Sequence, residues 1–232
     1  MYLGLDLGTS GLKALLLDKG HGVVAVATAP LDSARRSPGW SEQDPVDWIA
    51  ACTQVLDDLS DHLGSVQAIG IAGHMHGVVL LDAAGEVVRP CLLWNDTRAG
   101  AEAAAMDADP AFRAISGTIV FPGFSAPKMA WVRDHEPDHW ARTERVLFPK
   151  DFLAYWLTGT LNCEPSDAAG SALFDPGKGD WSPALCAAAG LSPDLLPPVI
   201  DSDSPRGPVR VEIAERFGLN PACMIAGGAG DN

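Results

Sequence analysis

The chain has 232 residues, 47% hydrophobic and 20% charged, which is the balance of a folded globular protein with a sizeable core. Its formal net charge of −14 argues against the clustered basic surface of a nucleic-acid-binding protein. The five cysteines are odd in number and form no CxxC pair, so neither a disulfide framework nor a zinc site is expected. No apolar run is long enough to span a membrane and no signal peptide precedes the first strand, so we expect a cytoplasmic enzyme.

The first thirty residues predict an antiparallel meander. Three short apolar runs joined by tight turns are typical of strands: residues 2–5, 14–18 and 22–27. The second turn, at residues 19–22, contains two glycines, which are predicted to supply the positive φ angles of a hairpin.

Helices and strands then alternate along the chain. Asp44 is predicted to cap a helix that starts at Pro45 and ends at about Leu59, with apolar residues three and four apart. Strands are predicted at 66–72, 78–82, 87–93 and 222–226, the first of them buried because it lacks polar alternation. Helices are predicted at 101–106, across most of 121–164 and at 209–217, with loops around short helices at 176–208. This order predicts an α/β fold with a mixed sheet and flanking helices.

A turn between the first two strands is the first candidate site. Glycines at both ends of residues 8–11 allow backbone amides to point at an anion. Thr9 and Ser10 add hydroxyl groups and Lys13 adds a positive charge, which makes these three candidate phosphate ligands. Asp6 is the candidate metal ligand, because Mg²⁺ binds few carboxylates and several waters. A plain glycine hairpin is the alternative interpretation.

The segment 73–77 is the second candidate site, because glycines bracket its two histidines. If the strand stays regular, His74 and His76 lie on one face and Met75 on the other. The glycine bracket clears space beside the chain and favours a sugar-binding role for one histidine. The alternative is an ordinary histidine of the partly buried core.

Two further segments carry polar groups suited to phosphoryl transfer to a small polar molecule. Trp94 and Asn95 offer an aromatic plane beside polar groups, although Asn95 or Asp96 could equally cap the following helix. Asp231 follows the glycine-rich residues 227–230 and is the candidate general base, because small-molecule kinases need a carboxylate to accept the proton of the attacking hydroxyl. A helix N-cap is its alternative role. Three other charged residues are predicted to be structural: Lys128, Asp151 and Asp167.

Taken together, these segments resemble the FGGY carbohydrate kinases of the actin and sugar-kinase superfamily. The segments that carry the resemblance follow one another in order: 1–13, 40–45, 71–77, 93–96, 122–128, 148–152, 166–170 and 227–232. The resemblance implies two ribonuclease-H-like domains with a cleft between them. Residues 1–232 would form the N-terminal, sugar-binding domain, and the C-terminal nucleotide-binding domain would be absent from this chain. We therefore expect the chain alone to be inactive.

The activity that the resemblance implies is ATP-dependent phosphorylation of D-xylulose, with Mg²⁺ as the cofactor. Asp231 would be the catalytic base, and Asp6, Thr9, Ser10 and Lys13 would face the phosphates and the metal. The implied sugar contacts are Met75, His76 and Asn232, with Trp94, Asn95 and Phe124 at the wall of the pocket.

The alternatives that remain open differ in substrate or in class. The same chemistry could act on ribulose, gluconate or glycerol, or the chain could be a non-catalytic sugar-binding module. An actin-like ATPase would use water as the nucleophile and make no sugar contacts. As partners we expect a small-molecule sugar and ATP, neither nucleic acid nor membrane, and a homodimer favoured by apolar surface that a missing domain would cover.

Overall fold

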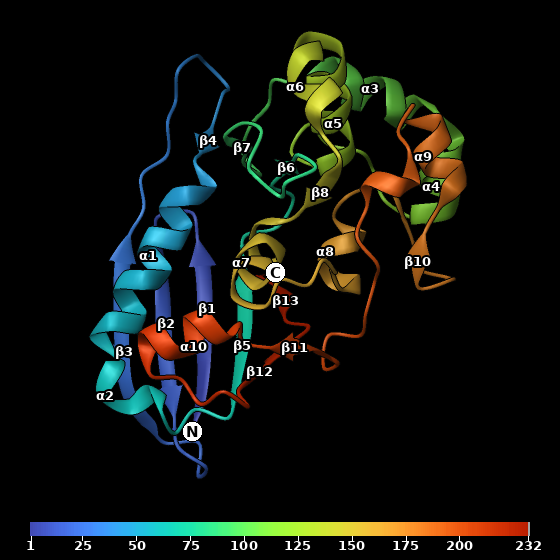
Figure 1. Ribbon diagram of the computed structural model, residues 1–232. Helices are drawn as coiled ribbons and strands as arrows, with labels where there is room; N and C mark the ends of the chain where they lie inside the picture. The colour runs from blue at the N-terminus through green and yellow to red at the C-terminus, as the bar shows by residue number, and fades with distance from the viewer. Residues whose placement is uncertain (232) are drawn as a thin grey trace.

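A mixed β-sheet organises one side of the molecule (Figure 1). The computed structural model describes residues 1–231. The strands of the sheet lie in the order β11-β12-β5-β1-β2-β3, and β13 also pairs with β5. Their bounds are β1 (Tyr2–Gly8), β2 (Gly11–Leu17), β3 (Val23–Pro30), β5 (Ala68–Gly73), β11 (Pro205–Pro208), β12 (Met224–Ala226) and β13 (Ala229–Gly230). The meander β1-β2-β3 is antiparallel, as predicted, whereas β5 runs parallel to β1 and β12 parallel to β5.

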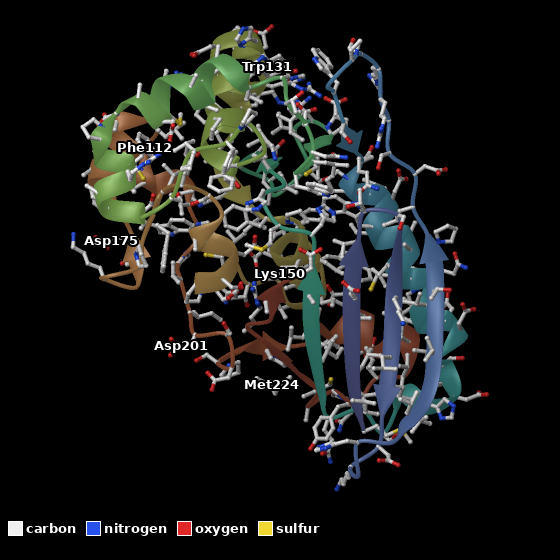
Figure 2. The ribbon with its side chains drawn as sticks, turned by 180° about the vertical axis from the view of Figure 1, so that it is seen from behind. Phe112, Trp131, Lys150, Asp175, Asp201 and Met224 are labelled. Atoms are coloured by element: carbon white, nitrogen blue, oxygen red, sulfur yellow. The ribbon has the colours of Figure 1, made fainter. Side chains whose placement is uncertain are left out.

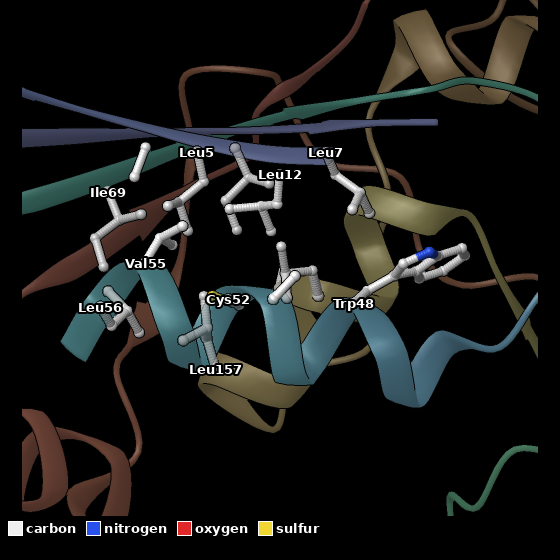
Figure 3. Packing of buried hydrophobic residues seen from close by; sticks show 14 of the residues in the cluster. Leu5, Leu7, Leu12, Trp48, Cys52, Val55, Leu56, Ile69 and Leu157 are labelled. Carbon is white, nitrogen blue, oxygen red and sulfur yellow. The ribbon is translucent and has the colours of Figure 1, made fainter. Parts of the chain in front are cut away.

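One face of this sheet is covered by helices. Alternate residues of β1 are buried, and they pack against the apolar side of α1 (Pro45–Asp58), where Trp48, Cys52 and Val55 recur at helical spacing (Figure 3). The predicted cap is confirmed, because the side chain of Asp44 accepts a hydrogen bond from the Val46 amide at 3.0 Å. Helices α7 (Pro149–Thr158) and α10 (Val211–Phe217) join the same core. Truncating Leu5 there to alanine would cost about 2–5 kcal/mol.

The opposite face of the sheet carries no helix over β1, β2 and β3, as the view from behind shows (Figure 2). Gly4 and Asp6 of β1 and Gly70 of β5 are exposed on it. The predicted strand at 66–72 is therefore present as β5, but the expectation that it is buried throughout is wrong. The strand does alternate between buried and exposed residues, but the sequence did not show this because the residues on the open face are glycine and alanine, which are not polar.

A second core forms the lobe at the upper right of Figure 1. Its helices are α3 (Gly100–Ala108), α4 (Pro110–Ser116), α5 (Ser125–His135), α6 (Pro137–Arg142) and α9 (Pro183–Ala188). Short elements complete the chain: α2 (Ser60–Leu63), α8 (Pro165–Ala169), η1 (Pro193–Leu195), β4 (Glu42–Gln43), β6 (Val79–Leu81), β7 (Cys91–Leu92), β8 (Arg145–Leu147), β9 (Phe174–Asp175) and β10 (Asp180–Trp181). None of the helices within residues 1–231 has the length and apolar character needed to cross a membrane.

Two local predictions are wrong. In the turn at 19–22 the residue with positive φ is His21, at 67°, and not a glycine. The amides of Gly20 and Gly22 instead donate to the Asp18 carboxylate. The helix after residue 96 is capped at Ala99, so capping is not the role of Asp96.

Asp96 is buried and ties two segments together. Its carboxylate accepts a hydrogen bond from the Ser41 amide at 2.6 Å, and it forms an ion pair with the Arg98 guanidinium at 2.7 Å. The Arg98 guanidinium also stacks over the Trp40 ring, 3.7 Å from its centroid. This carboxylate therefore fixes the loop that carries Trp94 and Asn95, instead of the helix that follows.

Candidate functional site

Three candidate segments meet at the carboxyl ends of parallel strands. β1 ends at the turn 8–11, β5 ends at Gly73, and β13 ends immediately before Asp231. The backbone pairing continues past the strand ends, because the His74 amide donates to the Leu7 carbonyl at 2.9 Å and the Asp231 amide to the Gly73 carbonyl at 3.2 Å. In open α/β sheets this edge is where ligands bind.

The chain changes direction directly after β5, and this separates the two histidines. His76 has a φ of 67°, an uncommon angle for a residue with a side chain. The condition under which His74 and His76 would share one face, a strand that stays regular, is therefore not met, because β5 ends at Gly73. His74 packs against Trp48, with 5.4 Å between ring centroids, whereas His76 stacks on Phe124 at 4.8 Å.

His74 belongs to the core. It is buried, and within residues 1–231 neither of its ring nitrogens has a hydrogen-bond partner. Burial, together with the charge of Lys128, lowers its pKa to about 4. His74 is therefore neutral at physiological pH, and the interpretation as a core histidine holds for this one of the pair.

His76 lies with the other candidate sugar contacts. Its Nδ1 is 2.8 Å from the Gly170 carbonyl oxygen. Burial lowers the pKa of His76. The hydrogen bond to Gly170 and the negative charge of Asp231 act in the opposite direction, so the Asp231 carboxylate lies close enough to influence the imidazole. Met75 packs against Gly230, where an added Cβ would lie 2.5 Å from Met75 Cγ. The structure thus gathers Met75, His76, Phe124 and Asp231 in one place.

A buried lysine supports the unusual backbone of His76. Lys128 Nζ donates to the His76 carbonyl at 2.9 Å, and Ser125 Oγ donates to the same oxygen at 3.2 Å. Lys128 is fully buried, and this burial lowers its pKa to about 7. Lys128 therefore has a structural role, as predicted: it stabilises the backbone conformation of His76, a candidate sugar contact.

The turn 8–11 is tied to the wall of the candidate sugar pocket. Trp94 Nε1 donates to Thr9 Oγ1 at 3.0 Å, and Gln43 Nε2 donates to the Thr9 carbonyl at 2.6 Å. Because the Thr9 hydroxyl accepts from the indole, its own hydrogen stays free to be donated to a phosphate oxygen. Ser10 is exposed at the tip of the same turn.

Asp6 and Lys13 face each other across β1 and β2, on the open face of the sheet. Both line a groove of about 540 Å³ whose other walls include Gly228 and Ala229. Among the residues that the structure describes, no group of three or more His, Cys, Asp or Glu side chains could enclose a metal ion. One exposed carboxylate beside the candidate phosphate-binding turn nevertheless fits Mg²⁺, which keeps several waters and takes substrate phosphates as ligands.

Two candidate residues are not brought into this group. Asn95 lines a separate pocket together with residues 35–41, and its buried Oδ1 has no partner within the described part of the chain. Asn232 lies outside the described residues.

A cluster of buried charges lies beside the site. The sequence predicted structural roles for two of its members, Asp151 and Asp167, but not that they meet Lys150 in one cluster. Lys150 Nζ is 2.7 Å from Asp151, 3.2 Å from Glu164 and 3.1 Å from Asp167, and Arg206 also pairs with Asp151. Figure 2 shows Lys150 between the sheet and the helical lobe. Burial lowers the pKa of Lys150, but its carboxylate neighbours outweigh this and shift it upward. Burial raises the pKa of Asp167. The signal available in the sequence was the Lys150-Asp151 pair inside an otherwise apolar helix.

The fold is α/β with a mixed sheet and flanking helices, and solved structures of sugar kinases superpose on it, which defines the class: a domain of the actin and sugar-kinase superfamily. Residues 1–232 match the model of the FGGY family of carbohydrate kinases, N-terminal domain, and the chain belongs to this family.

Relatives of known name point in the same direction. The chain is 43% identical to the xylulose kinase of Escherichia coli over 100% of its length and 48% of that protein. It is 36% identical to the xylulose kinase of Lactococcus lactis over 99% of its length and 47% of that protein. A solved structure described as a xyloylose kinase from Brucella ovis superposes with a TM-score of 0.97 at 49% identity, covering 100% of this chain and 49% of that one. The chain spans about half the length of the curated relatives that it matches.

Proposed function

We propose that this chain is the sugar-binding half of a two-domain kinase that converts D-xylulose and ATP to D-xylulose 5-phosphate and ADP. The observation that carries the proposal is the position of Asp231, which stands at the parallel edge of the sheet beside Met75 and His76. Relatives named xylulose kinase, at 32–43% identity over nearly the whole chain, support the choice of sugar.

In this proposal Asp231 acts as the general base. Its carboxylate accepts the proton of the C5 hydroxyl while that oxygen forms a bond to the γ-phosphorus, and the bond from the γ-phosphorus to the β-phosphate oxygen breaks to release ADP. Asp231 is exposed at the end of its strand, so a sugar hydroxyl can reach it. His76 and Phe124, stacked on each other, and Met75 hold the sugar in place.

The turn 8–11 binds phosphate in the same proposal. The free hydrogen of the Thr9 hydroxyl, the exposed Ser10 hydroxyl and the Lys13 ammonium offset charge on the phosphate oxygens. Asp6 would hold Mg²⁺, which supplies further neutralisation of phosphate charge when bound.

The proposal assigns the adenosine contacts to a second half of the protein. Because phosphoryl transfer needs both reactants in line, residues 1–232 alone should bind D-xylulose weakly, bind ATP more weakly, and turn over neither. We place the enzyme in the cytoplasm with small-molecule substrates as its ligands. The open sheet face is the surface through which the isolated half would self-associate.

A substrate panel tests the proposal. The full-length protein is assayed for ADP release with D-xylulose, D-ribulose, D-gluconate and glycerol, and D-xylulose should give the highest kcat/KM. Asp231→Asn should lower kcat by about 10²–10⁴-fold, the range for losing a general base, while D-xylulose binding survives. Asp203→Asn, at an exposed loop carboxylate, is the matched control. Preference for another sugar would refute the substrate, and near-normal turnover by Asp231→Asn would remove this residue from the mechanism.

A further inference from the structure

The glycine segment that carries Asp231 interrupts a strand. β12 pairs with the start of β5 and β13 with its end, so residues 227–228 leave the ladder between them. Gly228 has a φ of 83°, and a Cβ there would lie 2.3 Å from the Ile71 carbonyl oxygen. The position of Asp231 therefore depends on how the segment 227–230 is held.

Arg206 holds the start of this segment. Its Nε and Nη2 both donate to the Gly227 carbonyl, at 2.9 and 2.6 Å, and its Nη1 donates to the Asn162 carbonyl at 2.8 Å. The same guanidinium pairs with Asp151, and its side chain is 1% exposed. The Gly227 carbonyl is therefore fixed to the buried charge cluster by a fork of two charge-assisted bonds.

Ser166 holds the other end, next to the candidate base. The Gly230 amide donates to Ser166 Oγ at 2.9 Å, and Ser166 Oγ donates to Glu164 Oε1 at 2.7 Å. The same Glu164 oxygen lies 3.2 Å from Lys150 Nζ. Both ends of the segment are thus connected to one network, through Asp151 on one side and Glu164 on the other.

The network is suited to fixing a position. Its members are buried and paired, and removing one partner of a buried pair leaves an uncompensated charge, so their arrangement has few alternatives. Neither Ser166 nor Arg206 is among the residues gathered around Met75 and His76. The hydrogen bonds that lead from these two residues toward Asp231 run through the glycine segment.

We propose that Ser166 and Arg206 are positioning residues that fix the Asp231 carboxylate for proton abstraction, Arg206 through the Gly227 carbonyl and Ser166 through the Gly230 amide. This rests on the function proposed above, in which Asp231 is the base. A base must lie within hydrogen-bond reach of the proton that it removes, and a displacement of roughly 1 Å can cost about 10²-fold in rate.

The test uses the full-length protein with Ser166→Ala and Arg206→Lys. Ser166→Ala should lower kcat by about three- to tenfold, the effect of one neutral hydrogen bond, with KM for D-xylulose changed less than about twofold. Arg206→Lys, which cannot form the fork, should lower kcat further. Ser166→Thr keeps the hydroxyl at an exposed position and should restore kcat.

Matched controls remove similar bonds elsewhere. Ser182 Oγ accepts from the Leu185 amide, and Arg133 donates to the carbonyls of Ala189 and Gly190. Ser182→Ala and Arg133→Lys should leave kcat near the parent value. If they lower kcat as much as the test variants do, the effect is a general loss of stability and the proposal fails.

A double variant separates this proposal from the assignment of the base. If Ser166 acts through Asp231, adding Ser166→Ala to Asp231→Asn should cause no further loss; an equal further loss would overturn the proposal. Hydrogen exchange at the Gly230 amide, which needs no activity, should accelerate in Ser166→Ala, and unchanged protection would also overturn it. Full turnover by Asp231→Asn would instead refute the proposed base, while exchange would still decide whether Ser166 holds the segment.

Discussion

Lys128 should make the stability of the protein depend on pH. Its ammonium is fully buried, and burial lowers its pKa from 10.5 to about 7. The unfolded chain then binds this proton up to about pH 10.5 and the folded chain only to about pH 7, so stability rises with pH between the two values. Below pH 7 both states are protonated, and the full cost of burying the charge is present, about 5 kcal/mol for a difference of this size.

The expected change over an accessible range follows from these values. Between pH 7.0 and 8.5 the free energy of unfolding should rise by about 1.5 kcal/mol through Lys128 alone. Lys128→Met removes the titrating group while Ser125 Oγ still donates to the His76 carbonyl. The rise should therefore be smaller in this variant by the same amount.

Urea unfolding of the chain, followed by tryptophan fluorescence at the two pH values, measures both quantities. Other groups that titrate in this range, including Asp167, are common to parent and variant and cancel in the comparison. Lys19→Met, at an exposed lysine, is the control and should keep the parental slope. An equal change in parent and Lys128→Met would refute the burial of a charge at this position.

His76→Ala in the full-length enzyme should raise KM for D-xylulose by about tenfold and leave KM for ATP nearly unchanged; steady-state kinetics with each substrate varied would contradict the assignment if both rose equally. Asp6→Asn should lower turnover in a way that added Mg²⁺ partly recovers, and a loss independent of Mg²⁺ concentration would exclude Asp6 as a metal ligand. Gly228→Ala should destabilise the protein by at least about 1–3 kcal/mol, because φ is 83° and the Ile71 carbonyl blocks the new Cβ. Thermal unfolding should show a much smaller loss for Gly179→Ala, which has a φ of 70° in open space.

The sequence predicted well the elements that depend on local information. The meander of β1 to β3 follows from runs of apolar residues joined by tight turns, and the start of α1 follows from the Asp44 cap and Pro45. By contrast β8 and β13 escaped prediction, because two or three residues become a strand only through a partner distant in the chain. The predicted fold class, α/β with a mixed sheet, is nevertheless correct, because it depends only on the long elements.

The positions of candidate site residues could be predicted where glycines flank them in the sequence, but the directions in which their side chains point could not. The turn at 8–11 and Asp231 stand at one edge of the sheet, as glycine-flanked polar residues at strand ends suggested. The separation of His74 from His76 depends on one positive φ, which nothing in the local sequence specifies. The Lys150-Asp151 pair was visible in the sequence, but its partners were not, because Arg206 meets Asp151 only after the chain has folded back.

The late arrival of β12 has a consequence during synthesis of the protein. β5 ends at Gly73 and β12 begins at Met224, so about 150 residues must be made before that edge of β5 finds its partner. At roughly 5–20 residues per second, the edge stays unpaired for about 8–30 s on the ribosome. An unpaired edge of this kind can pair with other chains. The nascent chain therefore keeps an edge open to pairing with other chains until the segment that delivers Asp231 emerges.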